Sequence, residues 1–575
     1  MKNLLACFLM ISWHALPAQN IPTRFEQSNG RESPGYFEII DWWKKLDERS
    51  GKVKLLTMGM TDAGLPLHLA VVSNHGDYNF TNIRKNNKRI ILINNGIHPG
   101  EPDGIDASML LAMDIVTNRY RLPDNIVLGI IPVYNIGGCL RRSKNFRVDQ
   151  NGPDEKGFRG NSRNLNLNRD LIKCDARESR AFIEIFHMAD PDVFIDNHVS
   201  NGADYQHVMT LLSSQHNKLG GKMGAYINRE FDPALRRMMK EKDYDLIPYV
   251  NVDGDIPDKG WTAYWDSPRY SSGFASLWNT FAFLPETHML KPFEQRVKAT
   301  YALMQCFIRF TSENSDVIKQ IREEANRDVK TMKNFPLWWK LDSSKYTPIL
   351  FKGFGADYKT SEISGLPRLY YNRDKPFEAT IPFYNHYEAA SFVQKPKAYI
   401  IPQGWWEVIE LLKLNQVQMT TLKKDTSIEV EAYHIDGYKA AGHKYEKHHL
   451  NSQVIVSSRI LKMNFRKGDY YILMNQVANR FLMEVLEPQA EDSYFTWNFF
   501  DAILDQTEYY SDYVFEDIAA EYLKSNPSLK NLLEEKRKTD SSFAASGRAQ
   551  LDFIFHQSPY FDPANGIYPV YRILE

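Results

Sequence analysis

The sequence of 575 residues has no excess of either charge, because 70 Lys and Arg side chains stand against 71 Asp and Glu side chains. Binding of nucleic acid or of an anionic membrane by bulk charge needs a surface of one sign, so the composition excludes both as main partners. Cysteine is scarce as well, with four residues in the whole chain. This number excludes a small fold that is held together by disulfides.

Long apolar runs are absent after the N-terminus, and without a second stretch of about 20 apolar residues we expect no membrane span. The N-terminus, MKNLLACFLMISWHALPAQN, places one lysine before a short apolar run and the small residues ALPA. This pattern is typical of a signal peptide over residues 1–18, and it predicts an exported protein, either periplasmic or secreted. Cys139, Cys174 and Cys306 would remain after cleavage, and the sequence leaves their pairing open.

Short apolar runs alternate with helical patterns over the first half of the chain. The strand-like runs are 52–60, 65–73, 89–94, 126–134, 192–196 and 276–286, and the helical patterns are 36–48, 104–120, 178–191 and 294–313. Such alternation predicts an α/β fold whose sheet has substantial parallel content.

The pattern changes at about residue 330, where strand-like runs follow one another with little helix between them. Examples are KAYIIP, TSIEVEAYHI, SRILKMNF and DYYILMNQ, and helical sequence returns at 514–538. We therefore predict two domains after the signal peptide. The first is an α/β domain over 19–325, and the second is a β-rich domain with helical elements over 330–575.

Reactive side chains follow three of the buried strands. The run at 89–94 leads into His98 and Glu101, the run at 192–196 leads into His198, and the run at 276–286 ends on Glu286. Because open α/β sheets bind ligands at the carboxyl ends of their strands, we expect these four side chains to lie close together.

Two histidines and one glutamate form a catalytic zinc set, which leaves a fourth position for water. His98, Glu101 and His198 are the expected ligands of one zinc ion, and Asp196 could orient an imidazole. A further acidic group is needed as the general base, and Glu286 is the candidate.

The sequence also resembles a known family. The segments HPGE at 98–101, NLNRD at 166–170, DNH at 196–198 and PETHMLKP at 285–292 are similar, in order and spacing, to those of the zinc carboxypeptidase family (the carboxypeptidase A-like metallopeptidases). The resemblance covers roughly residues 36–315. It implies a mixed sheet flanked by helices and hydrolysis of a C-terminal peptide bond.

The resemblance further implies roles for substrate-binding residues. Asn168 and Arg169 would hold the free C-terminal carboxylate of a peptide, which suits arginine because its planar fork binds a carboxylate through two hydrogen bonds. An arginine that stabilises the oxyanion is expected upstream, and among Arg141, Arg142, Arg147, Arg159 and Arg163 we favour Arg147, then Arg142. The tyrosine near the mouth of the site would be Tyr270, with Tyr264 as the alternative.

Each motif also has a plainer interpretation. Glu101 and Glu286 could cap helices, and His198 could be a hydrogen-bonded structural histidine. The segment GHKYEKHHL at 442–450 repeats the spacing of His98 and Glu101, but its lysines would repel a cation, so we expect a solvated loop there. Two other functions stay open: a zinc amidase, deacylase or cell-wall peptide hydrolase with the same ligands, and a peptide-binding protein without turnover.

Overall fold

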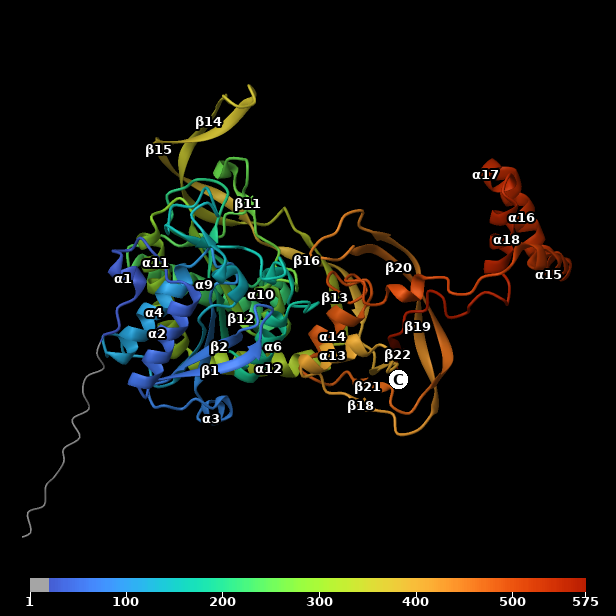
Figure 1. The fold of residues 1–575 in the computed structure, drawn as a ribbon, viewed down its shortest axis with the longest axis horizontal. Coiled ribbons are helices and arrows are strands. Elements are labelled where there is room, and N and C mark those ends of the chain that lie inside the picture. Colours follow the sequence, from blue (N-terminus) through green and yellow to red (C-terminus); the bar gives the residue numbers. More distant parts are fainter. Residues whose placement is uncertain (1–19, 575) are drawn as a thin grey trace, which may run out of the picture.

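The computed structural model of the protein describes residues 20–574, so the expected signal peptide lies outside the described residues. Figure 1 shows a first part in which helices surround a sheet, followed by a strand-rich second part, a long hairpin and a separate helical unit. No helix among residues 20–574 combines the length and the apolar character that a membrane crossing requires. In the same residues, the thiols of Cys139, Cys174 and Cys306 are buried and unpaired.

A mixed sheet of nine strands forms the centre of the first part, in the order β1-β2-β4-β3-β7-β12-β9-β10, with β8 beside β12. Strands β4, β3, β7 and β12 run parallel to one another, while β1, β2 and β9 pair antiparallel with a neighbour. The bounds are β1 (Val53–Met60), β2 (Pro66–Val72), β3 (Arg89–Asn94), β4 (Ile126–Ile131), β7 (Val193–Asp196), β8 (His198–Ser200), β9 (Met209–Ser213), β10 (Ile247–Pro248) and β12 (Phe281–His288). The mixed, mostly parallel sheet confirms the predicted fold class.

The central strands are apolar on both sides because helices cover both faces of the sheet. In β3, Ile91 and Ile93 pack into one core, whereas Ile90 and Leu92 pack into another on the opposite face. The first core is covered by α2 (Tyr36–Arg49), α4 (Asp103–Val116), α9 (Asp232–Lys240) and α11 (Phe293–Glu313), and the second by α3 (Phe80–Lys85), α6 (Arg177–Ala189) and α10 (Ser271–Leu277). Shorter elements are α1 (Arg24–Gln27), α5 (Ile136–Leu140), β5 (Arg142–Ser143), β6 (Lys156–Gly157), α7 (His216–Leu219), α8 (Gly221–Tyr226) and β11 (Trp261–Thr262), and α12 (Ser315–Thr331) ends this part.

One predicted run divides into two elements. Residues 276–286 were expected to form a single buried run, but α10 continues to Leu277 and β12 begins only at Phe281. Between them Asn279 has a positive φ of 52°, a conformation that asparagine adopts more readily than most residues and that stops the helix. The predicted strand end at Glu286 nevertheless lies within β12.

A six-stranded sheet dominates the second part, in the order β18-β21-β17-β22-β19-β20. Its last strand in sequence, β22, lies between β17 and β19 in the middle of the sheet. The bounds are β17 (Ala398–Ile401), β18 (Thr420–Thr421), β19 (Thr426–Ala440), β20 (Asn451–Phe465), β21 (Tyr470–Leu473) and β22 (Tyr571–Ile573), with α13 (Trp406–Leu414) and α14 (Asn479–Leu486) beside them. Strands β13 (Asn334–Leu341) and β16 (Tyr387–Gln394) pair with each other, and β14 (Thr347–Thr360) and β15 (Pro367–Tyr384) form the projecting hairpin of Figure 1.

Four helices near the C-terminus form a unit of their own. They are α15 (Asp512–Ser525), α16 (Pro527–Thr539), α17 (Ser541–Ala544) and α18 (Gly547–His556), and they pack around a separate apolar cluster that includes Phe515 and Phe555. Figure 1 shows this unit apart from the rest of the molecule. The chain leaves for the unit and returns from it at nearly the same place, because Gly566 N–H donates to Ile503 O at 2.8 Å.

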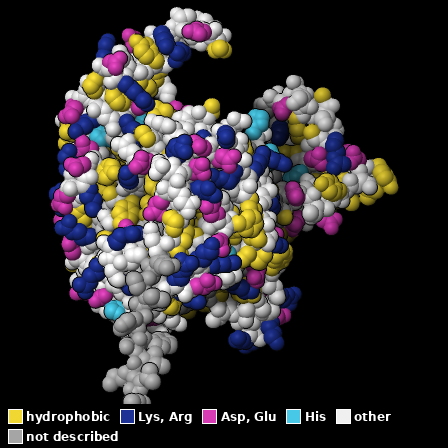
Figure 2. All heavy atoms as spheres, turned by 60° about the vertical axis from the view of Figure 1, so that its left-hand side comes forward, with side chains coloured by type: hydrophobic (Ala, Val, Ile, Leu, Met, Phe, Trp, Pro, Cys, Tyr) yellow, Lys and Arg dark blue, Asp and Glu magenta, His cyan; other side chains and the backbone are white. Residues whose placement is uncertain are grey.

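The two parts share one core. A single buried cluster contains Phe186 of α6 and Phe194 of β7 together with Leu411 of α13 and Phe481 of α14. The division of the chain into two domains near residue 330 therefore remains a prediction from the sequence. Packing joins the strand-rich part to one face of the first sheet. The surface in Figure 2 carries basic and acidic side chains interspersed, as the balanced charge of the sequence suggests.

Candidate active site

Two strand ends bring the three expected metal ligands together. His98 and Glu101 lie in the loop between β3 and α4, and His198 is the first residue of β8, directly after β7. Since β3 and β7 are parallel neighbours, their carboxyl ends meet at the same edge of the sheet. All three side chains are buried, and one potential ligand atom from each lies within 4.8 Å of those of the other two.

The Nδ1 atoms of both imidazoles face the Glu101 carboxylate. His198 Nδ1 lies 3.0 Å from Glu101 Oε2, and His98 Nδ1 lies 3.3 Å from Glu101 Oε1. His98 Nδ1 is buried without a hydrogen-bond partner, and burial lowers the pKa of this imidazole to about 4, which keeps it neutral. A neutral imidazole with a free lone pair, beside a second imidazole and a carboxylate, fits a zinc ion.

Contacts behind each histidine fix its orientation. Asn166 Oδ1 accepts a hydrogen bond from the Asn168 N–H at 3.2 Å and lies 2.9 Å from His98 Nε2. Because that oxygen can only accept, Nε2 carries the proton of His98 and Nδ1 is left for a metal. Behind the other imidazole, Asp196 Oδ2 lies 3.2 Å from His198 Nε2 and accepts from Ser271 Oγ at 2.5 Å. Asp196 thus makes the contact that the sequence suggested.

Two arginines hold the Glu101 carboxylate. Arg147 Nη1 lies 2.7 Å and Arg159 Nη1 lies 3.2 Å from Glu101 Oε1. Burial alone would raise the pKa of Glu101, but Arg147 and His98 hold it well below its ordinary value. Arg159 was one of five candidates and was not favoured. Arg142 is directed elsewhere, because it donates to backbone carbonyls of Ser33, Pro34 and Glu155 and does not line the cavity described next.

A cavity of about 400 Å³ opens beside the three ligands. Asn168, Arg169 and Tyr270, three of the residues named from the sequence, line it. The guanidinium of Arg169 lies over the Tyr270 ring, 4.3 Å from its centre. Asn168 Oδ1 accepts the Ser271 N–H at 3.2 Å, which joins the NLNRD loop to the start of α10.

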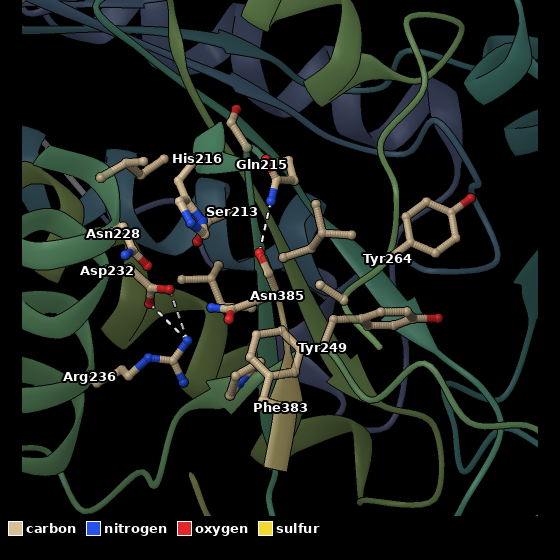
Figure 3. A pocket seen from close by; sticks show the side chains of 16 residues that line it. Ser213, Gln215, His216, Asn228, Asp232, Arg236, Tyr249, Tyr264, Phe383 and Asn385 are labelled. Carbon is tan, nitrogen blue, oxygen red and sulfur yellow. Dashed lines mark hydrogen bonds and ion pairs between the residues drawn. The ribbon is translucent and has the colours of Figure 1, made fainter. Parts of the chain in front are cut away.

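Tyr249 and Tyr264 form one wall of this cavity. The two rings lie 6.1 Å apart, and Tyr264 also lies 5.4 Å from Tyr270. Behind them is a second, small cavity of about 60 Å³, shown in Figure 3, with an ion pair of Asp232 and Arg236. In Figure 3 the hydroxyl groups of both labelled tyrosines point away from that ion pair. Tyr249 could not be identified from the sequence, since nothing in its local pattern marks it.

Glu286 lies on the same edge of the sheet. It is paired in register with His198 across β12 and β8, and it lines the larger cavity. Burial raises the pKa of Glu286 to about 8, and the neighbouring Glu101 adds to this, while His198 opposes it. A carboxyl group of this kind binds and releases a proton near neutral pH, which is what a general base or acid requires.

The segment 442–450 is not a loop free in solvent. Glu446 Oε2 accepts the backbone N–H of Asn166 at 2.9 Å, although 280 residues separate the two in sequence. Lys447 and His448 both contact Asp175. Most of the expected solvated loop is exposed, but these three side chains lie against the first part of the chain, Lys447 and His448 through the opposite charge of Asp175 and Glu446 through a backbone N–H.

Comparisons with known proteins agree with the geometry. Residues 39–199 match the sequence profile of a family described as "Zinc carboxypeptidase". The chain is 20% identical over 434 residues to "Carboxypeptidase 2" of Trichophyton tonsurans, which covers 70% of this chain and 72% of that protein. It is also 20% identical over 433 residues to "Carboxypeptidase 2" of Trichophyton equinum, with the same coverage of 70% and 72%.

Two solved structures are similar at low sequence identity. A metallo-carboxypeptidase from Burkholderia cenocepacia is 14% identical, with a TM-score of 0.36, and the match covers 48% of this chain and 69% of that one. Carboxypeptidase A from Helicoverpa armigera is 15% identical, with a TM-score of 0.37 and coverage of 49% and 74%. By sequence, residues 39–199 are therefore similar to the zinc carboxypeptidase family, a family of zinc metallopeptidases.

Proposed function

We propose that the protein is a zinc-dependent carboxypeptidase, exported and active on peptides with a free C-terminal carboxylate. The observation that supports this most strongly is the placement of Arg169 in the same cavity as the ligand set His98, Glu101 and His198. The guanidinium of Arg169 can bind a carboxylate through two hydrogen bonds. Binding of the terminal carboxylate there would bring the last peptide bond of a substrate toward the ligand set.

Substrate binding would begin at Arg169. Its Nη1 donates to Asn168 O at 2.6 Å and its guanidinium lies over the Tyr270 ring, and these two contacts restrict the orientation of its remaining N–H groups. Asn168 lines the cavity beside it and can donate a further hydrogen bond through its amide. We propose that these two residues hold the terminal carboxylate.

Hydrolysis would depend on Glu286. A zinc ion held by His98, Glu101 and His198 would lower the pKa of a water molecule and polarise the scissile carbonyl. Glu286 would take the proton of the attacking water and pass it to the leaving amine. Its pKa of about 8 reflects burial, and it would fall when the three ligands hold a cation, which favours the ionised form that a base needs.

Arg147 and Arg159 would stabilise negative charge on the reacting carbonyl oxygen. Both guanidinium groups line the cavity and lie next to Glu101. Charged donors aimed at a developing oxyanion lower the barrier, because they are already oriented before the reaction. We propose the oxyanion role for this pair and no role for Arg142.

The proposal is tested by combining metal analysis with kinetics on the mature protein. Wild type should contain one zinc per chain and release the C-terminal residue of a peptide. Glu286→Gln should contain the same amount of zinc and lose at least about 1000-fold in kcat, since it keeps the ligands and removes the base. Glu184→Gln, an exposed carboxylate on α6, is the matched control and should resemble wild type. Undiminished cleavage by Glu286→Gln would exclude the assignment of the base.

A further inference from the structure

The turn between β19 and β20 reaches from the strand-rich part to the loop that holds His98 in place. Tyr445 N–H donates to His448 O at 2.8 Å and His448 N–H donates to Tyr445 O at 3.0 Å, so Glu446 and Lys447 are the two central residues of a tight turn. This turn closes the hairpin of β19 and β20, which belongs to the second part of the chain in Figure 1.

The two central residues are unusual for such a turn. Glu446 has a φ of 47° and Lys447 a φ of 81°. Two-residue turns with positive φ at both central positions strongly favour Asn-Gly or Gly-Gly, because a Cβ atom is crowded in this region. A glutamate and a lysine are unfavourable in this backbone conformation. Such strained conformations persist where contacts with the surrounding structure stabilise them.

Both side chains make contacts with the first part of the chain. Glu446 Oε2 accepts the Asn166 N–H at 2.9 Å. Lys447 Nζ lies 3.1 Å and His448 Nε2 lies 2.9 Å from the two oxygens of Asp175. The turn therefore contacts the chain at Asn166, before Arg169, and at Asp175, after it.

Aromatic packing holds the turn at that position. The Tyr445 ring is stacked with Trp497 at 6.3 Å between centres, and the His448 ring meets Trp497 edge-on at 5.5 Å. Trp497 is fully buried, and its indole N–H donates to Asp492 at 3.0 Å. Packing of Tyr445 and His448 on the buried Trp497 thus fixes the position of the turn that carries Glu446.

Asn166 connects this carboxylate to the metal ligand. Its backbone N–H is held by Glu446, and its side-chain oxygen faces His98 Nε2 at 2.9 Å. A residue that contacts a metal-ligating histidine fixes the tautomer and the angle of its ring. Any movement of the Asn166 backbone would therefore change the contact between Asn166 Oδ1 and His98 Nε2.

We propose that Glu446 is a positioning residue, which sets the orientation of His98 through Asn166 and so raises the affinity of the site for zinc. This inference rests on the proposed function, because it takes the three-ligand set as a zinc site. It gives the strand-rich part a direct role in forming the metal centre of the other part.

The test measures the zinc dissociation constant of the full-length metal-free protein by competition with a chromogenic chelator. Glu446→Gly removes the acceptor and at the same time suits the positive φ, so the unfolding temperature of the metal-free protein should change little. Its zinc dissociation constant should rise about 3- to 10-fold, somewhat less than the 10- to 100-fold known for groups that contact the ligand itself. Glu446→Gln keeps an acceptor oxygen and should stay within about twofold of wild type.

Lys444→Ala, an exposed residue of the same connection, is the matched control and should bind zinc as wild type does. Unchanged zinc affinity in Glu446→Gly, with wild type binding tightly, would overturn this inference alone. An equal loss in Glu446→Gln and Glu446→Gly would also overturn it, because hydrogen bonding would then not be the cause. Absence of zinc binding by wild type would overturn the proposed function together with it.

Discussion

The guanidinium carbon of Arg169 lies over the Tyr270 ring, 4.3 Å from the centre of that ring. With the ring on one side, the N–H donors that do not bind Asn168 O can bind an anion in the cavity. Several properties of the enzyme should depend on this pair.

Replacement of Arg169 by lysine should weaken the binding of free-acid peptides. Lysine keeps the charge but cannot form two parallel hydrogen bonds, so kcat/KM should fall about 10- to 100-fold, mostly through KM. Steady-state kinetics with one peptide series measures this. Arg163→Lys is the matched control, since Arg163 in the same loop donates to Asp175 O at 2.8 Å and does not line the cavity. Equal effects of the two substitutions would argue against a carboxylate site at Arg169.

Substitutions of Tyr270 should separate the ring from its hydroxyl group. Tyr270→Phe keeps the stacking on Arg169 and should leave KM within about twofold. Tyr270→Ala removes it and should raise KM about fivefold, the value of roughly 1 kcal/mol for a cation–π contact. A large fall in kcat for Tyr264→Phe, with no such fall for Tyr270→Phe, would assign the role of the tyrosine near the mouth of the site to Tyr264 instead.

Glu178 should make stability depend on pH. This carboxyl is 0% exposed, one of its oxygens has no hydrogen-bond partner, and burial raises its pKa to about 7. The folded state therefore keeps a proton that the unfolded state releases above about pH 4.5. The resulting stability is present below about pH 4.5 and is lost as the pH rises toward 7.

Glu178→Gln removes this dependence. Its free energy of unfolding should exceed that of wild type by about 2 kcal/mol at pH 8, whereas the two proteins should be similar at pH 4.5. Urea unfolding at both pH values measures the difference. Glu184→Gln on the exposed side of the same helix serves as the control. A variant less stable than wild type at pH 8 would contradict the assignment of a protonated Glu178.

The helical unit α15–α18 should be dispensable for folding of the rest. It has its own apolar cluster, and the segments that enter and leave it are joined by the Gly566–Ile503 hydrogen bond and by one from Asn565 to Asp505 O at 3.1 Å. Replacement of residues 508–562 by a short Gly-Ser linker should keep zinc content and peptide hydrolysis within about twofold. Removal of β22, by contrast, should unfold the second sheet because that strand lies in its middle. Loss of soluble protein in both cases would show that the unit is not independent.

Much of the site could be predicted because short apolar strands are followed directly by the reactive residues. His98 and Glu101 lie in the loop that follows β3, and His198 lies two residues after the end of β7. The parallel pairing of β3 and β7 brings those strand ends together. Here the local pattern and the sheet topology agree, so residues far apart in sequence could be placed at one edge.

Other residues could not be predicted because long loops and distant segments bring them to the site. Arg159 comes two residues after the short strand β6, which itself follows a long loop. Tyr249 comes directly after β10, a two-residue strand at the edge of the sheet. Glu446 is 280 residues from Asn166 in sequence, and it lies on a turn whose sequence does not favour the observed conformation. The change of composition at residue 330 correctly indicated a change from helices to strands, but it contained no information about the core that the two parts share.

The most direct test of the account is the release of the last residue from a peptide mixture, with free and amidated C-termini compared in parallel. Wild type should cleave only the free-acid peptides, and both chelation and Glu286→Gln should abolish cleavage, with added zinc restoring the chelated enzyme. Equal cleavage of the amidated peptides would contradict a carboxylate site at Arg169 and favour an amidase or endopeptidase. Absence of cleavage by the zinc-loaded wild type would contradict carboxypeptidase activity itself.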